Sequence, residues 1–224
     1  MRNNYLESDM VASLAKALPK LFSTDTSFRE FSTGYGIADL VFAVDFEFKK
    51  NSFDRFPINN YYALRIFLEL RDDTQYALPE LQKTYSYLPT SQLKRILDYL
   101  SLHGYLTKSD KSSWEKCAPS GPFNPIKKII AIEAKLTDYK AGLMQARRYQ
   151  YFADESYLAL LKSSSQKVPV DELKTGNIGL IVFDEHSGEI EIKHRPSKST
   201  GLQQSALNLL AKELLITKYV EQFT

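Results

Sequence analysis

Residues 127–135, Lys-Lys-Ile-Ile-Ala-Ile-Glu-Ala-Lys, constrain the fold more than any other stretch of this chain. A β-strand places alternate side chains on opposite faces, so Glu133 and Lys135 share one face with Ala131, while the isoleucines occupy the other. Burying a glutamate and a lysine is costly unless each has a partner. The segment therefore predicts a core strand whose charged face carries an ion, a substrate or both.

A second apolar run, residues 34–44, has an acid, Asp39, near its start and is rich in strand-forming residues. If the two strands pair, facing side chains lie about 5 Å apart, and Asp39 and Glu133 can bind one divalent cation. Mg²⁺ fits this arrangement because it takes few carboxylate oxygens, keeps several waters and completes its shell with substrate phosphate. Lys135 would then lie beside a metal-bound water.

Composition sets wide limits on function. With 224 residues, 43% of them hydrophobic, the chain can form one larger domain or two small ones, and its net charge of +2 permits a nucleic-acid partner without requiring one. The single cysteine, Cys117, excludes an internal disulfide and a cysteine-cluster metal site. No apolar run reaches the roughly 18 residues of a membrane span, and no signal peptide is evident. We expect a cytoplasmic protein with no membrane partner.

The N-terminal region predicts a helix followed by a hairpin. Apolar residues at helical spacing indicate a helix over residues 7–18, closed by Pro19. Glu7 lies in its first turn, where a carboxylate stabilises the positive helix end; a role as a third metal ligand is the alternative. Residues 28–33 and 37–44 are expected to pair about a Gly-Tyr-Gly turn.

The chain between Asp39 and Glu133 is far longer than neighbouring strands need, which predicts a folded insert over residues 57–118 within a core formed by residues 1–56 and 119–224. Helices are expected over residues 58–70, with Tyr62, Ile66, Phe67 and Leu70 inward, over 78–86, and over 90–103, where a Thr or Ser cap precedes apolar positions 93, 96, 97 and 100. A two-stranded hairpin over residues 105–117 follows. This order resembles a winged helix-turn-helix domain.

The winged-helix resemblance implies that the third helix enters the DNA major groove. The residues that would contact DNA are Gln92, Lys94 and Arg95 on that helix and Lys108 and Lys111 on the hairpin. Residues 59–118 contain eight Lys or Arg against seven Asp or Glu, however, which is a poor balance for gripping phosphates. An insert that packs or binds a partner protein is therefore an equally open interpretation.

A helix over residues 139–153 follows the charged strand. Gln145 and Tyr149 are spaced i, i+4 on one face, with Arg148 beside Gln145. Residues 127–150 contain six Lys or Arg against two acids, a local basic patch. Because a helix separates the strands expected over residues 129–135 and 156–161, these should be parallel neighbours. Further on, a short helix (170–174), two strands (178–184 and 189–194) and a helix (202–220) are expected.

The ordered set of elements resembles the PD-(D/E)xK nuclease superfamily. The set comprises a first helix with Glu7, a strand with Asp39, a strand ending Glu133-Ala-Lys135, a helix with Gln145-Ala-Arg-Arg-Tyr149 and a following apolar strand. The Gln-x-x-x-Tyr helix is similar to that of its RecB-like branch. Two departures are Ala38, where the family often has proline, and the long insert. The resemblance implies an α/β (α+β), restriction-endonuclease-like core, with a central mixed sheet flanked by helices.

The resemblance also implies hydrolysis of DNA phosphodiester bonds. Asp39 and Glu133, with Glu7 as a further ligand, would hold Mg²⁺ or Mn²⁺, and Lys135 would orient the attacking water and offset negative charge. Gln145 and Tyr149 would position phosphate or the site residues, unless they only bond helix to sheet. Arg148 is a plausible phosphate contact.

Two other functions stay open from sequence. One is a non-catalytic DNA-binding or regulatory protein built on a nuclease-like scaffold, although a retired site has no physical reason to keep a costly charge cluster. The other is an enzyme that acts on RNA or on a protein-bound substrate. A partner protein or a homodimer is compatible with each of these functions.

Overall fold

A computed structural model describes residues 5–46, 56–117, 126–197 and 205–223 of the chain. These fall into two compact units, described separately below. The core unit comprises Met1–Glu47 and Pro125–Leu215, and the insert unit comprises Phe48–Asn124 and Ile216–Thr224. The predicted insert, residues 57–118, lies inside the second unit.

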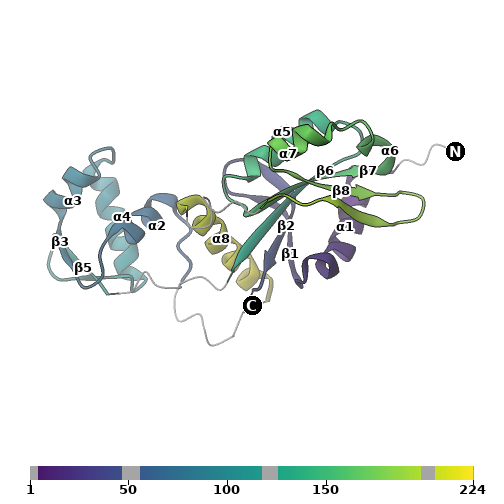
Figure 1. The fold of residues 1–224 in the computed structure, drawn as a ribbon. Helices are drawn as coiled ribbons and strands as arrows, with labels where there is room; N and C mark the ends of the chain where they lie inside the picture. The colour runs from purple at the N-terminus through teal and green to yellow at the C-terminus, as the bar shows by residue number, and fades with distance from the viewer. Residues whose placement is uncertain (1–4, 47–55, 118–125, 198–204, 224) are drawn as a thin grey trace. The chain divides into compact units, whose positions relative to one another are not determined.

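The core unit is built on a six-stranded mixed sheet with strand order β1-β2-β6-β7-β8-β9 (Figure 1). The strands are β1 (Thr26–Ser32), β2 (Ile37–Val44), β6 (Lys128–Lys135), β7 (Glu155–Leu161), β8 (Gly179–Phe183) and β9 (Ile190–His194). Strands β6, β7 and β8 are parallel, and the other neighbouring pairs are antiparallel. The predicted hairpin, the pairing of the two acid-bearing strands and their parallel neighbour are confirmed.

Helices cover both faces of this sheet, which makes the fold α/β (Figure 1). On one face, α1 (Glu7–Phe22) packs its buried side chains on the isoleucine face of β6. On the other, α5 (Tyr139–Tyr149) lies over β6 and β7, and α6 (Lys162–Ser165) and α7 (Val170–Thr175) lie near β8. A last helix, α8 (Ala206–Phe223), follows; of its predicted range, residues 202–204 lie outside the described residues.

Helix α1 corrects one prediction, because it does not end at Pro19. It continues to Phe22 and ends at Ser23, whose left-handed backbone (φ 53°) allows Thr24 to donate a hydrogen bond of 3.0 Å to the Pro19 carbonyl. Proline removes one helical hydrogen bond, but Leu18 and Phe22 are both buried in the core around the sheet. Tertiary packing of this last turn outweighs the local preference.

Between residues 56 and 117, the insert unit has three helices and a three-stranded antiparallel sheet of order β3-β5-β4. Its elements are α2 (Tyr61–Glu69), β3 (Gln75–Ala77), α3 (Leu78–Thr84), α4 (Thr90–Leu102), β4 (Leu106–Lys108) and β5 (Ser113–Lys116). Strand β3 was not predicted. The helices and the hairpin were, and the four predicted apolar positions of the third helix, Leu93, Ile96, Leu97 and Leu100, are buried.

Two details of the insert differ from prediction. Tyr62 is exposed, because the buried face of α2 is formed by Ala63, Leu64, Ile66 and Phe67 and Tyr62 lies outside it. The N-cap of α4 is Pro89, without a capping side chain, and Thr90 is already helical. Across the described residues, no helix combines the length and apolarity needed to cross a membrane.

Candidate active site

The predicted acid of β2 lies where the pairing of β2 and β6 ends. The antiparallel register runs from Val44 opposite Lys128 to Leu40 opposite Ile132. Beyond this pair, Asp39 Oδ2 accepts a 2.7 Å hydrogen bond from the backbone N–H of Ala134. The Asp39 carboxylate thus takes the place of a backbone carbonyl as the hydrogen-bond partner of Ala134. Ala134 is the residue between Glu133 and Lys135.

Glu133 is 1% exposed and both of its carboxylate oxygens have partners. Oε1 lies 2.7 Å from Lys135 Nζ, and Oε2 accepts a hydrogen bond from the hydroxyl of Tyr149. The same hydroxyl is 2.7 Å from the carbonyl oxygen of Ile37. Tyr149 therefore links helix α5 to both acid-bearing strands.

Lys135 connects this cluster to the first helix. Its Nζ lies 3.5 Å from Glu7 Oε1, in addition to its contact with Glu133. The Glu7 side chain is 45% exposed, whereas that of Lys135 is mostly buried. The structure thus brings Glu7, Asp39, Glu133, Lys135 and Tyr149 together at one end of β6.

The electrostatics of the cluster follow from its burial. Burial raises the pKa of Asp39 and of Glu133, although the Ala134 N–H opposes the shift at Asp39 and Lys135 opposes it at both. Burial lowers the pKa of Lys135, but its hydrogen bond to Glu133 and the nearby carboxylates outweigh this, so that its pKa is raised. Lys135 is consequently a cation at neutral pH, which suits the stabilisation of negative charge better than the acceptance of a proton.

The donor set is compatible with a divalent cation. Asp39 Oδ1 has no hydrogen-bond partner among the described residues, and the Glu7 carboxylate is partly open to solvent. Glu133 can coordinate a cation through lone pairs that its present partners do not use. Within the described part of the chain, no three His, Cys, Asp or Glu side chains are grouped as a metal site. A two-carboxylate set suits Mg²⁺, because that ion retains waters.

The two other residues predicted on α5 lie at its surface. Gln145 is half-buried, and no hydrogen bond of its side chain is found within the described residues. Arg148 is exposed, and its charge acts on the pKa of the Tyr149 phenol. Of the predicted Gln-x-x-x-Tyr pair, the tyrosine is hydrogen-bonded to Glu133, and no such bond from Gln145 is found among the described residues.

Sequence reasoning missed Gly142, which allows α5 to approach β6. A Cβ atom on this residue would lie 2.8 Å from Lys135 Cγ and 2.6 Å from Leu158 Cδ1. The signal available in the sequence was a glycine inside a helix, where its intrinsic cost implies a packing reason.

The residues of the insert that were predicted to contact DNA are not all available to bind phosphate. Gln92, Lys94 and Arg95 are exposed on α4, and Lys111 is exposed in the hairpin turn. Lys108 is engaged, since its Nζ lies 2.9 Å from Asp98 Oδ1 and 5.4 Å from the centre of the Trp114 ring.

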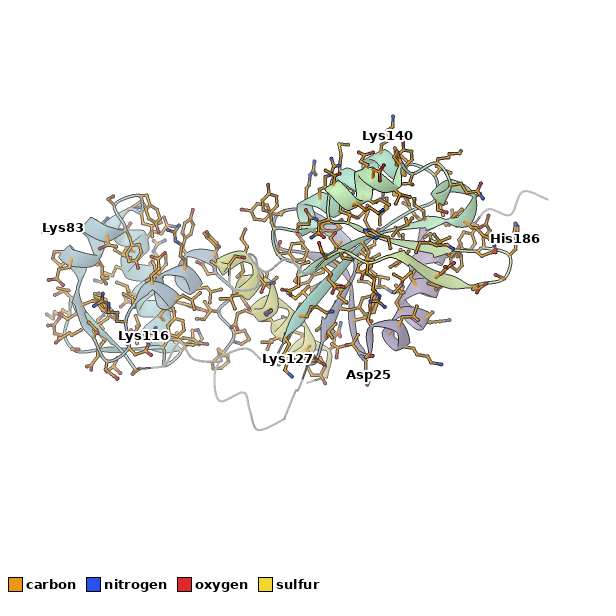
Figure 2. The ribbon with its side chains drawn as sticks, in the orientation of Figure 1. Asp25, Lys83, Lys116, Lys127, Lys140 and His186 are labelled. Atoms are coloured by element: carbon orange, nitrogen blue, oxygen red, sulfur yellow. The ribbon has the colours of Figure 1, made fainter. Side chains whose placement is uncertain are left out.

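One further lysine of the insert is buried and cannot contact DNA. Lys116, labelled in Figure 2, is fully buried and donates a 2.8 Å hydrogen bond to the Leu70 carbonyl. It also lies 2.9 Å from Asp72. With Arg65, which lies 2.7 Å from Glu69, at least three of the eight basic residues between 59 and 118 are thus paired within the insert unit.

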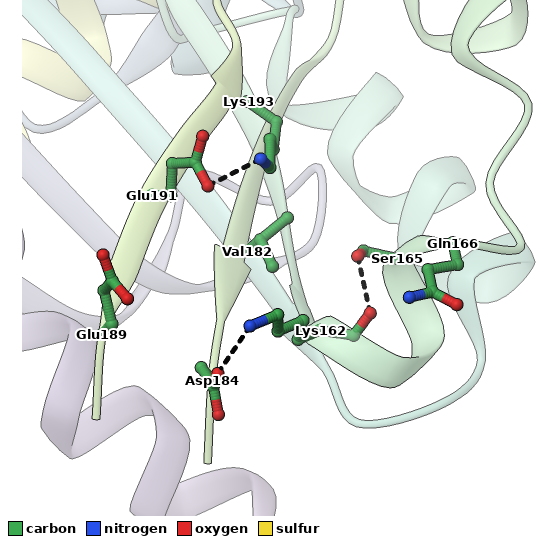
Figure 3. Close-up of a pocket in the computed structure, with 8 residues that line it drawn as sticks. All are labelled: Lys162, Ser165, Gln166, Val182, Asp184, Glu189, Glu191 and Lys193. Carbon is green, nitrogen blue, oxygen red and sulfur yellow. Dashed lines mark hydrogen bonds and ion pairs between the residues drawn. The ribbon is translucent and has the colours of Figure 1, made fainter. Parts of the chain in front are cut away.

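A cavity of about 290 Å³ lies between α6, β8 and β9 in the core unit (Figure 3). Four of its charged side chains form two ion pairs, Lys162 with Asp184 at 2.8 Å and Lys193 with Glu191 at 2.7 Å, and Glu189 also lines it. The cavity belongs to the β9 edge of the sheet, whereas the acid cluster is on β2 and β6. We therefore assign the candidate active site to the cluster.

The fold and the cluster together define an α/β protein with an acid–lysine–tyrosine site at the end of a mixed sheet. Comparison with models of known families, with curated proteins and with solved structures finds no match to this chain.

Proposed function

We propose that the protein is a metal-dependent deoxyribonuclease of the PD-(D/E)xK type that hydrolyses phosphodiester bonds. One observation carries the proposal. The carboxylate of Asp39 binds the backbone of Ala134, the residue between Glu133 and Lys135. Two acids and a lysine from neighbouring strands thereby share one small volume, which is the arrangement that metal-assisted phosphoryl chemistry needs.

Each residue has a distinct role in this proposal. Asp39 and Glu133 would hold Mg²⁺ or Mn²⁺, and the partly exposed carboxylate of Glu7 pairs with Lys135 at 3.5 Å. Such an ion would supply Lewis-acid chemistry, which polarises a phosphate and makes water a better nucleophile. Lys135 offsets negative charge that develops on the phosphate, and Tyr149 fixes the orientation of Glu133.

The insert is proposed to be a winged-helix-like module that assists substrate or partner binding. Its three helices and small sheet support the likeness in element order. Because Lys108 and Lys116 are paired internally, the exposed Lys94, Arg95 and Lys111 supply the remaining candidate phosphate contacts. The core's own basic segment, residues 127–150, offers further exposed cations at Lys127, Lys140 and Arg148, while its three other basic residues are ion-paired.

The test is a cleavage assay on linear, circular and branched DNA with Mg²⁺, Mn²⁺ or EDTA, comparing the wild type with Lys135→Ala. Lys16→Ala is the matched control, since it removes an exposed lysine from the middle of α1. Metal-dependent cleavage that is lost only in Lys135→Ala supports the enzyme. DNA binding without cleavage in either metal favours the non-catalytic regulator, and cleavage of RNA alone would change the substrate class.

A further inference from the structure

Two exposed tyrosines touch each other at one end of the core unit. Tyr35 lies between Gly34 and Gly36, whose φ angles of +91° and +125° are accessible mainly to glycine, in the turn between β1 and β2. Tyr151 follows the end of α5, and the two ring centres are 5.4 Å apart. The residues are 43% and 54% exposed, so the pair leaves aromatic surface open to solvent.

This pair borders the candidate active site. The hydroxyl oxygen of Tyr149, two residues before Tyr151, lies 2.7 Å from the carbonyl oxygen of Ile37, two residues after Tyr35. Ile37 is 60% exposed and, by strand alternation, shares a face of β2 with Asp39. We refer to Tyr35, Ile37 and Tyr151 as the aromatic platform.

Two arginines lie on the Tyr151 side of the platform. Tyr151 lines an open cavity of about 460 Å³ together with Arg147, Gln150, Thr175 and Gly176. Arg148 is exposed beside Tyr149, and Arg147 forms a long ion pair of 3.4 Å with Glu172. Aromatic rings flanked by arginines are the chemistry that binds single-stranded nucleic acid, because bases stack on the rings while phosphates meet the charges.

We propose that the aromatic platform stacks unpaired bases of single-stranded DNA and so leads the adjacent phosphate to Asp39 and Glu133. In a duplex each base face is covered by its neighbour, so the platform selects single strands, flaps or frayed ends. The preference determines which DNA is cleaved only if the proposed nuclease function is correct. Binding of single-stranded DNA can nevertheless be measured without cleavage.

The experiment measures the Kd of the wild-type protein in EDTA for fluorescein-labelled oligothymidylate and for a duplex of equal length, by fluorescence anisotropy. Tyr35→Ala and Tyr151→Ala should each weaken single-strand binding by roughly 5- to 150-fold, the range for loss of one stacked base, and change duplex binding little. Tyr→Trp at either position should preserve single-strand binding. Tyr→Leu should weaken it although it retains apolar bulk.

Met144→Ala, an exposed site on α5, is the matched control and should leave both Kd values unchanged. Thermal melts of all variants establish that each is folded. Equal affinity for single strand and duplex, or Leu variants that bind as tightly as the wild type, would overturn the platform. Tighter binding of oligouridylate than of oligothymidylate would overturn the choice of DNA.

The two proposals fail separately. If Mg²⁺-dependent cleavage of single-stranded DNA depends on Lys135 but not on either tyrosine, the platform is wrong and the nuclease stands. If no cleavage occurs in any metal, yet single-strand binding falls in both Ala variants, the nuclease is wrong and the platform stands.

Discussion

Tyr149 is the residue through which α5, β2 and β6 meet at the site. Its hydroxyl contacts Glu133 Oε2 and the Ile37 carbonyl, while its ring is buried 5.8 Å from that of Phe152. Tyr149→Phe retains the ring and removes the link. We expect cleavage to fall by about 10- to 100-fold, the usual cost of losing a group that orients a metal ligand, measured as kcat/KM in Mg²⁺.

The matched control is Tyr157→Phe, because Tyr157 is also buried and its hydroxyl donates a 2.9 Å hydrogen bond to Glu155, away from the cluster. Both variants lose one buried hydrogen bond and should be destabilised by a similar amount, about 1–3 kcal/mol. Only the Tyr149 variant should lose more cleavage activity than its loss of folded protein accounts for. An equal loss in both would reduce Tyr149 to a packing residue.

The raised pKa values of Asp39 and Glu133 predict two effects of pH with opposite signs. As pH falls through the raised pKa values, protons displace metal, so the increase in Tm caused by Mn²⁺ should shrink, beginning above the ordinary carboxyl values of 3.8 and 4.5. Without metal, the folded state binds these protons more tightly than the unfolded state. The contribution of both acids to stability therefore increases as pH falls toward the ordinary values.

Thermal melts across this pH range, with and without Mn²⁺, check the prediction. Glu133→Gln removes one titrating group and should flatten both dependences. A Mn²⁺-induced increase in Tm that persists unchanged to pH 4.5 would mean that neither acid holds the ion.

At the scale of elements, the closeness of α5 to β6 depends on Gly142. An alanine Cβ there would lie 2.8 Å from Lys135 Cγ and 2.6 Å from Leu158 Cδ1, so a side chain or the helix must move. We expect Gly142→Ala to destabilise the fold by about 1–3 kcal/mol and to lower cleavage by displacing Lys135. Ala141→Gly, next to it on the helix, is the control, as it costs helix propensity without the clash. Unchanged activity in Gly142→Ala would show that Lys135 tolerates the shift.

The strands and their pairing could be predicted from sequence because their signals are local. The alternation of side chains along β6 predicted that Ile130 and Ile132 lie in the core. The helix between β6 and β7 predicted that these two strands are parallel. The helix end at Pro19 was mispredicted because packing of the last turn of α1 overrides local preference, and Tyr62 because the buried face of α2 is centred on other positions. The contacts of Tyr149 with Ile37 and of Glu7 with Lys135 depend on tertiary register, which no local pattern contains.

At the scale of the whole molecule, the chain leaves the sheet near Val44 and returns near Lys128, which are paired neighbours in β2 and β6. Antiparallel partners lie about 5 Å apart, so a hairpin turn of roughly 2–5 residues can replace residues 46–126. Every residue of the cluster and of the platform remains. A second variant also ends at Leu215, because the last residues of α8 belong to the insert unit and Thr217 bonds Asn59 there at 2.9 Å.

We expect at least one of these shortened proteins to fold and to cleave short single-stranded DNA in Mg²⁺ within about tenfold of the full chain, a loss of about 1.4 kcal/mol. Circular dichroism and gel-based cleavage, with Lys135→Ala in the same background, provide the measurements. Binding of long DNA should weaken by whatever the insert contributes, and its salt dependence should decrease if Lys94, Arg95 and Lys111 contact phosphates. A shortened protein that folds but cleaves nothing would make the insert part of the active site, because the core then lacks a group that catalysis requires.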